Sequence, residues 1–361
     1  MPANAKAIDL RRLRATIPDD VFELPRIRTF AKALFLLAIL SSALVLGSRM
    51  ESLAGRLLLG IAMGPFIFAL ASLGHEAGHR TASRWRFLND LTGILTMSVL
   101  GIPAFGWKIK HDIHHKFGGV ARLDTDAEWA LDDYLALGSL KRWWVRTFGR
   151  HEFLFWWAAP ISLWITSWRF AIANLFEARR TGPRRTLWSL SDMAVAACFF
   201  LALVLYTATF GWLNLLLLVL IPFAGSGLVA AVAFVPNHRA MPPLTMEQAR
   251  RAARYTHINS RTVTYPPLLP GNYFMNYVPW QIEHHVFPTV AGYRLPRVSP
   301  CLKAYAEEEG IRLQYETIFR AIPRMLRRDW LWGNEDGRLY TFAEAERIRR
   351  ERLTRPAPSQ A

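Results

Sequence analysis

Cysteine is scarce in this chain of 361 residues: only Cys198 and Cys301 occur, and Cys198 lies inside an apolar run. Two such residues exclude a disulfide framework and a cysteine-based metal site. Ribonucleoprotein, zinc-finger and helix-turn-helix patterns are also missing, although the formal net charge is +16. We therefore expect no nucleic-acid partner. The N-terminus lacks a signal-peptide cleavage pattern, and the apolar run that begins near Thr29 is long enough to remain as a span.

Acidic residues are few, with 28 Asp and Glu against 44 Lys and Arg. At the same time 52% of the residues are hydrophobic and 13% are aromatic. Apolar blocks set among basic blocks are typical of a membrane protein with several spans. The positive charge is then expected in loops on the cytoplasmic side of the membrane.

Four apolar stretches are long enough to cross the roughly 30 Å hydrocarbon core, which takes about 20 helical residues. They lie near residues 29–47, 57–74, 193–210 and 212–235. The distribution of basic residues predicts that both termini and the loop 75–190 are cytoplasmic. Two more apolar stretches in that loop, 91–107 and 152–176, have basic flanks. We interpret them as helices lying in the interface, with a true pair of spans as the alternative.

Histidines form three clusters along the chain. The first, HEAGH at 75–79, matches the HExxH pattern of zinc metalloproteases. The second is HDIHH at 111–115, and the third is QIEHH at 281–285. Histidines three or four residues apart share one helix face, whereas adjacent histidines diverge by about 100° and can reach two different metals. The clusters contribute His75, His79, His111, His114, His115, His284 and His285.

The number of histidines distinguishes between two kinds of metal site. A catalytic zinc takes three protein ligands and keeps one position open. Seven histidines exceed that requirement more than twofold, and so many imidazoles suit a two-metal centre. An Asp-Gly ligand motif is not evident, since Asp124 in LDTD does not precede a glycine. An intramembrane zinc metalloprotease remains a remote alternative, and a metal-free lipid-binding or scaffold protein is a third.

The boxes HxxxH, HxxHH and QxxHH, in this order among these spans, resemble those of the membrane fatty-acid desaturase family. Residues 272–300 are similar to the front-end acyl desaturase branch, in which Gln replaces the first His. Asp124 and Asp126 match the Asp pair that follows the second box in the family. Two features depart from it: a His-Pro-Gly-Gly haem-domain motif is absent, and residues 117–119 are Phe-Gly-Gly rather than the commoner Thr-Asn.

The resemblance covers roughly residues 30–315 and implies an all-α integral membrane protein. Four transmembrane helices, interfacial helices and a cytoplasmic, histidine-rich di-iron cap are expected. The chain is predicted to divide into a cytoplasmic segment 1–28, a membrane domain 29–315 and a cytoplasmic tail 316–361. The missing fused electron donor favours a bacterial inner membrane.

The resemblance implies that the seven box histidines bind two irons. His238, in FVPNHRAM, matches a further family histidine, with a helix cap as the alternative role. Gln281 and His257 are expected as weaker ligands or as residues that support ligands. Three carboxylates are adjacent to ligands in the sequence and are expected either to accept a ring N–H or to face solvent: Glu76, Asp112 and Glu283.

The activity that the resemblance implies is desaturation of a long acyl chain, with O2 as cosubstrate and two electrons from a separate donor. Hydroxylation, decarboxylation and oxidation of a non-acyl lipid are alternatives on the same centre. Basic residues on the cytoplasmic face are expected to attract an acidic, ferredoxin-like donor and anionic membrane lipid.

Overall fold

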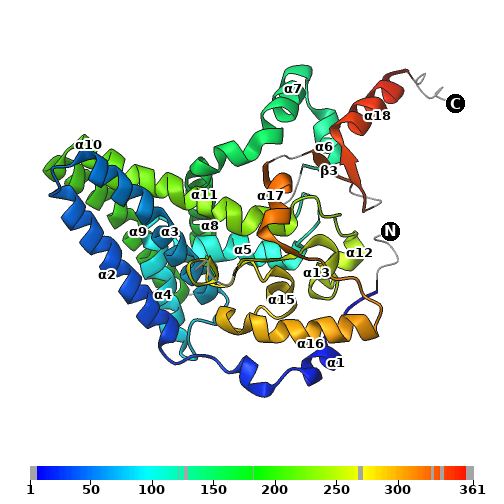
Figure 1. Ribbon diagram of the computed structural model, residues 1–361, viewed down its shortest axis with the longest axis horizontal. Coiled ribbons are helices and arrows are strands. Elements are labelled where there is room, and N and C mark those ends of the chain that lie inside the picture. The colour runs from blue at the N-terminus through cyan, green and yellow to red at the C-terminus, as the bar shows by residue number, and fades with distance from the viewer. Residues whose placement is uncertain are drawn as a thin grey trace.

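The computed structural model describes residues 6–120, 122–125, 129–181, 183–266, 271–326, 329–333 and 337–354. Most of this part of the chain is helical (Figure 1). Its first half contains α1 (Leu10–Thr16), η2 (Asp19–Phe22), α2 (Arg28–Ser48), α3 (Leu53–Gly78), α4 (Arg86–Ser98), α5 (Ala104–Phe117), α6 (Leu131–Ala136), α7 (Ser139–Thr147), η3 (Gly149–Ala158) and α8 (Ala159–Thr181).

The second half adds further helices and two small sheets. The helices are α9 (Pro183–Phe210), α10 (Trp212–Leu215), the π-helical turn η4 (Leu216–Leu220), α11 (Ile221–His238), α12 (Met246–Ala249), α13 (Ala252–Asn259), α14 (Gly271–Phe274), α15 (Gln281–Val286), η5 (Gly292–Arg294), α16 (Leu295–Glu308), α17 (Ile318–Leu326) and α18 (Phe342–Thr354). Strand β1 (Thr262–Thr264) pairs in parallel with β2 (Tyr315–Thr317), and β3 (Trp330–Trp332) pairs antiparallel with β4 (Leu339–Thr341).

Four helical segments in the described chain are long and apolar enough to cross a membrane, which confirms the predicted number of spans. They are Arg28–Ser48, Leu53–Gly78, Thr186–Phe210 and Trp212–His238. Gly211, with φ +81°, makes the turn between the last two spans, a backbone conformation that favours glycine. Two of the spans continue past the predicted ends at residues 74 and 235 and thereby carry His75 and His238 into the histidine-bearing layer.

Small residues allow the spans to pack closely. A Cβ at Gly60 of α3 would lie 1.9 Å from the carbonyl oxygen of Leu217, and one at Gly64 would lie 3.1 Å from the backbone of Gly225. Close backbone approach of this kind is how membrane helices gain packing energy without a hydrophobic driving force. It fixes α3 against α11, and these two helices bring in histidines from distant parts of the sequence.

The predicted apolar stretch 91–107 is divided between α4 and α5. The break falls at Gly101, with φ +64°, followed by Pro103. Asp192 of α9 accepts hydrogen bonds from the backbone N–H groups of Ala104 and Phe105, at 2.9 and 2.8 Å, and so caps α5. The stretch 152–176 forms η3 and α8, and α8 is not among the candidate spans. The interfacial placement of both stretches stays a prediction.

The α15 helix is enclosed by the N-terminal helix α1 and by α16, which follows it in the chain. Leu13 of α1, Ile282 of α15 and Leu302 of α16 belong to one buried cluster. Strand β2, which follows α16, pairs with β1. The all-α prediction is confirmed, with two small sheets added. The domain division at residues 28 and 315 stays a prediction, and packing runs across both of these positions.

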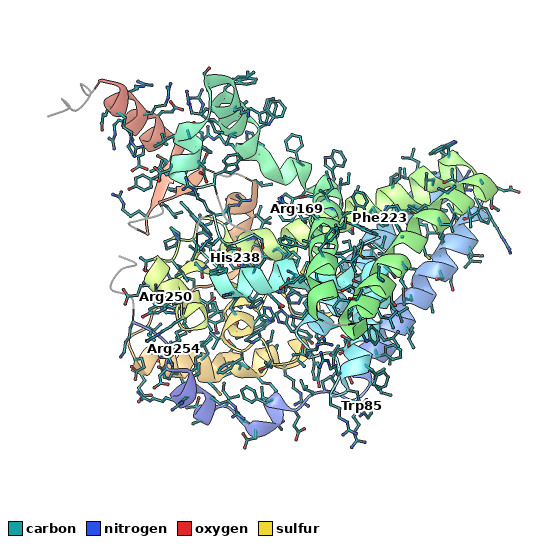
Figure 2. All side chains as sticks on the ribbon, turned by 180° about the vertical axis from the view of Figure 1, so that it is seen from behind. Trp85, Arg169, Phe223, His238, Arg250 and Arg254 are labelled. Carbon is teal, nitrogen blue, oxygen red and sulfur yellow. The ribbon has the colours of Figure 1, made fainter. Side chains whose placement is uncertain are left out.

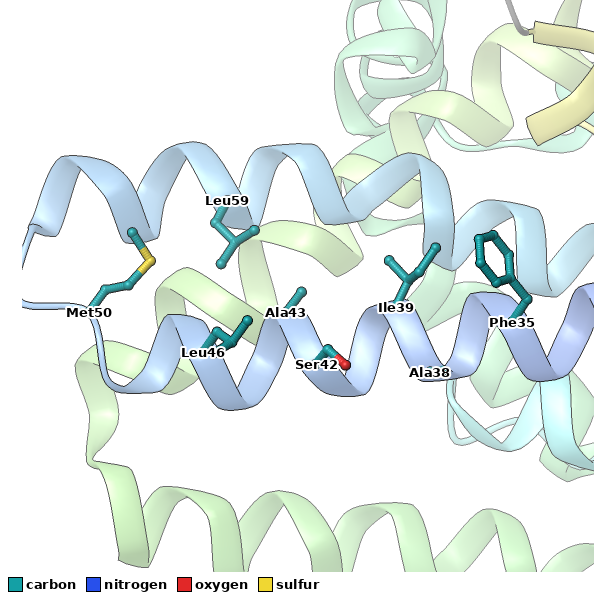
Figure 3. Close-up of a pocket in the computed structure, with 8 residues that line it drawn as sticks. All are labelled: Phe35, Ala38, Ile39, Ser42, Ala43, Leu46, Met50 and Leu59. Atoms are coloured by element: carbon teal, nitrogen blue, oxygen red, sulfur yellow. The ribbon is translucent and has the colours of Figure 1, made fainter.

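An apolar groove of about 540 Å³ runs between α2 and α3 on the outside of the bundle (Figure 3). Phe35, Leu46 and Leu59 are among its lining residues, and Phe35 and Leu46 are more than half exposed. Apolar side chains on the outside of a span are expected to contact lipid.

Replacing Gly60 by alanine tests the packing of α3 against the last span. We expect Gly60→Ala to lower the free energy of unfolding by about 1–3 kcal/mol, because the new methyl group would clash with a backbone oxygen that cannot move independently. The measurement is the midpoint of thermal unfolding in detergent. Gly138→Ala is the control, since a Cβ there has no atom within 4 Å. Equal midpoints for the two variants would contradict this account of the packing.

Candidate metal centre

The first histidine pair lies where α3 leaves the bundle. His75 is in the last turn of α3 and His79 follows directly after it, with ring centroids 4.9 Å apart. Arg80, with φ +64°, reverses the chain after this point, and the hydroxyl of Thr81 donates to the carbonyl of Glu76 at 3.0 Å. The pair is thus held on one helix face, as the i, i+4 spacing predicts.

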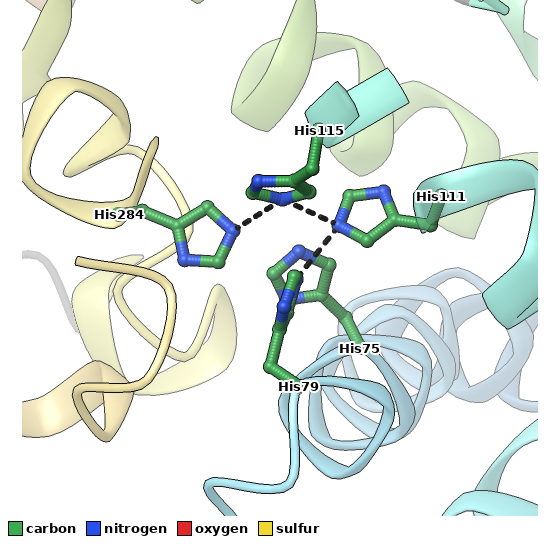
Figure 4. A group of neighbouring side chains, drawn as sticks. All are labelled: His75, His79, His111, His115 and His284. Carbon is green, nitrogen blue, oxygen red and sulfur yellow. Dashed lines mark hydrogen bonds between the residues drawn. The ribbon is translucent and has the colours of Figure 1, made fainter. Parts of the chain in front are cut away.

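The second and third boxes meet the first at this point (Figure 4). Nε2 of His111 lies 2.9 Å from Nε2 of His79 and 3.0 Å from Nε2 of His115. Nε2 of His284 lies 3.2 Å from Nε2 of His115. The five residues His75, His79, His111, His115 and His284 each offer a ligand atom, and these atoms lie within 4.8 Å of one another. We call them the first group.

A second group consists of His114, His238 and His285, whose ligand atoms also lie within 4.8 Å of one another. Adjacent histidines are therefore divided between the groups: His114 and His115 belong to different groups, as do His284 and His285. This is the divergence that 100° per helical residue predicts. All eight histidines expected as ligands, His238 included, are brought together. Figure 2 shows His238 in the interior, where α11 reaches this layer.

The spacing of the nitrogens suits metal ligation. A neutral imidazole carries one N–H, yet Nε2 of His111 and Nε2 of His115 each face two other Nε2 atoms at 2.9–3.2 Å. Imidazole nitrogens bind a metal at about 2.0–2.1 Å, so two of them at right angles around it lie about 3.0 Å apart. The donor set of the first group fits a metal ion of that kind.

Hydrogen bonds fix the rings of the second group. Nδ1 of His114 lies 2.6 Å from Oδ1 of Asp124, and the backbone N–H of Gly119 donates to Oδ2 of the same carboxylate at 2.9 Å. Nδ1 of His238 lies 3.1 Å from the carbonyl oxygen of Asn259 and donates to it. Both contacts place the proton on Nδ1 and the lone pair on Nε2, the arrangement that orients a metal ligand. Asp126, the other member of the predicted Asp pair, lies outside the described residues.

Gln281 lies within the second group. Its Nε2 is 2.7 Å from Nε2 of His285 and 3.0 Å from Nε2 of His238, and Nδ2 of Asn237 donates to its Oε1 at 3.4 Å. The other polar atom of Asn237, Oδ1, is buried without a hydrogen-bond partner among the described residues. Gln281 is therefore placed where a ligand or a ligand-orienting residue is expected.

The three carboxylates expected to accept ring N–H groups contact other partners in the described structure. Asp112 pairs with Lys108 at 2.6 Å and is 54% exposed, so the solvent-facing alternative holds for it. Glu283 accepts from the hydroxyls of Thr262 and Tyr315, both at 2.6 Å. Glu76 accepts from the side chain of Asn276 and from the backbone N–H of Gly292.

The reason for this correction is helical geometry. A residue adjacent to a ligand on a helix points about 100° away from it, so its carboxylate faces another neighbour. The carboxylate that does contact a ligand, Asp124, lies ten positions after His114 and reaches it through a turn. The resemblance identified Asp124. The backbone carbonyl of Asn259 has no sequence pattern that could have identified it.

His257 stands apart from both groups. It is buried, its Nδ1 has no hydrogen-bond partner among the described residues, and burial lowers its pKa to about 4. Its predicted role as a weak ligand is not supported by its placement, because the two groups close without it.

Burial keeps the clustered imidazoles uncharged. Loss of hydration lowers the pKa of His79, His111, His115, His284 and His285 well below the ordinary value, and the neighbouring imidazoles lower it further. A metal binds the neutral form of histidine. These five rings are therefore held in the neutral form that a metal binds.

Comparison with known proteins agrees with this geometry. The family model for fatty acid desaturases matches residues 52–317. That range includes the four histidine-bearing segments and three of the four spans. The resemblance to the family is thus confirmed, and the more specific resemblance to the front-end branch stays a prediction.

Individual relatives match over shorter or more divergent stretches. An sn-1 acyl-lipid omega-3 desaturase (ferredoxin) from Nostoc sp. (strain 36) is 31% identical over 121 residues, 32% of each chain. An sn-1 linoleoyl-lipid 6-desaturase from Arthrospira platensis is 24% identical over 288 residues, 75% of each chain. An oleate hydroxylase from Claviceps purpurea is 32% identical over 127 residues, which are 32% of this chain and 26% of the hydroxylase.

The matched segments span about a third to less than half of the first three relatives, at 32%, 44% and 33% of their lengths. The family model, in contrast, matches most of this chain. On the match over residues 52–317, together with two clustered histidine groups at the ends of apolar spans, the chain belongs to the fatty acid desaturase family.

Proposed function

We propose that this chain is a membrane di-iron oxidoreductase that introduces a double bond into a long acyl chain of a lipid. One observation carries the proposal: two groups of clustered histidines lie side by side where apolar spans end. The family supports the acyl substrate. Removing hydrogen from an unactivated carbon chain is beyond acid–base side chains and requires a redox cofactor.

The residues of the two groups suit two irons. His75, His79, His111, His115 and His284 would hold one, and His114, His238, His285 and Gln281 would hold the other. Imidazole-rich sites suit iron, and eight histidines are too many for one catalytic zinc. When bound, the irons would supply oxygen activation: the acyl chain loses two hydrogens, O2 takes up these, two electrons and two protons, and two waters form.

The protein's own side chains orient the ligands and exclude water. Asp124 and the carbonyl of Asn259 hold the rings of His114 and His238. The indole of Trp107 stacks on His111, with centroids 4.7 Å apart, and meets the ring of His75 edge-on at 5.6 Å. A buried indole on this side keeps bulk water away from the first group.

We infer that the histidine layer and both termini face the cytoplasm of a bacterial inner membrane, and that electrons come from a ferredoxin-like protein. The basic excess in the flanks of the spans supports this orientation. Arg250 and Arg251 are exposed beside α13, the helix whose carbonyl holds His238, and Figure 2 shows Arg250 and Arg254 at the edge of the molecule. Such a basic edge suits an acidic donor. The donor class also appears in the names of two matched relatives.

Hydroxylation of the acyl chain is the second candidate, because the matched relatives include an oleate hydroxylase. The two reactions share the need for oxygen activation and differ in what happens at the carbon after the first hydrogen is lost.

Expression in a bacterial host with defined lipids tests the function. We expect lipid mass spectrometry to show acyl chains two mass units lighter, and O2 depletion to abolish them. His111→Ala should abolish the product, because it removes a ring at the centre of the first group. His151→Ala should retain it, because His151 is exposed and lies outside both groups. Chains heavier by one oxygen would instead favour the hydroxylase, and unchanged lipids with a reduced donor present would contradict both.

Asp124→Asn tests the orientation of the second group. The asparagine amide oxygen is uncharged and accepts the ring N–H more weakly than the aspartate carboxylate does. We therefore expect the iron affinity of the second group to fall about 10- to 100-fold. The measurement is iron retained per chain during dialysis against a chelator. Asp112→Asn is the matched control, because that carboxylate pairs with Lys108 on the surface. Equal iron retention in the two variants would count against the role of Asp124.

The lowered pKa values predict an acid-sensitive apoprotein. The folded pKa of His79, His111, His115, His284 and His285 lies below the ordinary value of about 6.5, so the unfolded chain binds more protons in the window between the two values. The free energy of unfolding of the metal-free protein should therefore fall as the pH is lowered below about 6.5, by roughly 1.4 kcal/mol per pH unit for each such histidine. His111→Asn should make the dependence shallower than in the unmodified chain. Thermal unfolding between pH 7 and pH 5 measures this, and identical slopes would refute it.

A further inference from the structure

Helix α7 turns its three largest apolar side chains away from the protein. Leu140, Trp143 and Trp144 are 75%, 46% and 58% exposed. They are three and four residues apart and therefore share one helix face. A contiguous exposed patch of large apolar side chains marks a surface that contacts another apolar phase.

In contrast, one cationic side chain of α7, Arg142, is buried against the protein. Arg142 is 7% exposed, and its guanidinium donates to the carbonyl of Leu137 and lies 3.7 Å from the carboxylate of Glu346. The hydroxyl of Tyr134 donates to the same carboxylate at 2.8 Å. Because Arg142 is anchored toward α18, the opposite face of α7 with its two indoles is fixed outward. Large apolar side chains on the outward face are unusual for a helix packed on a protein in water.

The aromatic face continues into η3. Phe148 packs against the rings of Trp143 and Trp144, with centroids 5.7 and 4.3 Å apart, and Phe155 and Trp157 are each about half exposed. Figure 1 shows α7 at the rim of the molecule. We call the exposed set the aromatic surface, which consists of Leu140, Trp143, Trp144, Phe155 and Trp157.

The position of η3 along the spans gives the depth of this surface. A Cβ at Gly227 of α11 would lie 2.2 Å from the carbonyl oxygen of Trp156, so η3 crosses α11 at that residue. Gly227 is about 22 Å along the helix from Trp212, where the span begins. The hydrocarbon core of a bilayer is about 30 Å thick. The crossing therefore lies within the depth of the hydrocarbon, which places Phe155 and Trp157, the neighbours of Trp156, beside the bilayer.

Two exposed cations accompany the aromatic face. Lys141 and Arg146 are exposed, and α7 has no acidic residue. Lysine and arginine on an interfacial helix extend their charged ends to the headgroups while their alkyl parts remain in the apolar region. Tryptophan favours the same boundary.

We propose that α7 and η3 form a membrane-docking surface that lies in the plane of the leaflet on the histidine-bearing side. The aromatic surface enters the acyl region, and Lys141 and Arg146 contact anionic phospholipid headgroups. Continuity with α11 at Gly227 selects the bilayer over a second copy of the chain or a soluble protein as the occupant. The inference depends on the spans and is independent of the metals.

Spin labelling in nanodiscs tests the docking. Leu140→Cys is labelled in a chain whose native cysteines are replaced by serine, in discs of phosphatidylcholine with phosphatidylglycerol. We expect the ratio of O2 to aqueous nickel-chelate accessibility at position 140 to lie within about twofold of that at Leu201→Cys on the exposed side of α9. Arg11→Cys in α1 is the aqueous control, since its side chain is exposed outside the spans.

Two results would overturn the docking. A ratio at position 140 equal to that at Arg11→Cys would place α7 in water, and protection from both reagents would show a protein contact instead of lipid. The headgroup preference has its own test in the double variant Lys141→Gln/Arg146→Gln. Its ratio at position 140 should fall about twofold in discs with phosphatidylglycerol and stay constant in phosphatidylcholine alone. An equal change in both discs would rule out the anionic preference.

Discussion

The structure depends on one constraint: imidazoles from four distant segments must converge on two points while remaining neutral. Charged imidazoles at 2.9–3.2 Å would repel one another, and burial, which lowers the pKa of rings such as His111, favours their neutral form. The N-terminal helix α1 and helix α16 pack over α15 and contribute to that burial. The packing of α3 against the last span at Gly60 and Gly64 therefore supports the metal centre, because these two segments carry His75 and His238 into the histidine-bearing layer.

Much of this arrangement could be predicted from sequence. Hydropathy gave the four spans, because a bilayer demands about 20 apolar residues whatever their neighbours. Helical spacing predicts that the adjacent residues His114 and His115 point to different metal groups, and that His284 and His285 do the same. The i, i+4 spacing of His75 and His79 predicts that α3 continues beyond its apolar run, which hydropathy alone does not show because it ends where polar residues begin.

The supporting contacts were the least predictable part of the site. The carboxylates of Asp112 and Glu283 neighbour ligands in sequence yet face Lys108 and two hydroxyls, since adjacent helical residues diverge. The partner of His238 is a backbone carbonyl, which every residue possesses. The outward aromatic face of α7 follows from where Arg142 is anchored, and that partner lies about two hundred residues away in the sequence. Contacts of this kind are decided by tertiary packing rather than by local pattern.

Metal analysis of the purified chain tests the central claim most directly. The account predicts two irons per chain, and an X-ray absorption spectrum at the iron edge with a first shell dominated by nitrogen at about 2.1 Å, as expected for imidazole ligands. A single zinc per chain without iron, or a first shell dominated by oxygen, would contradict it.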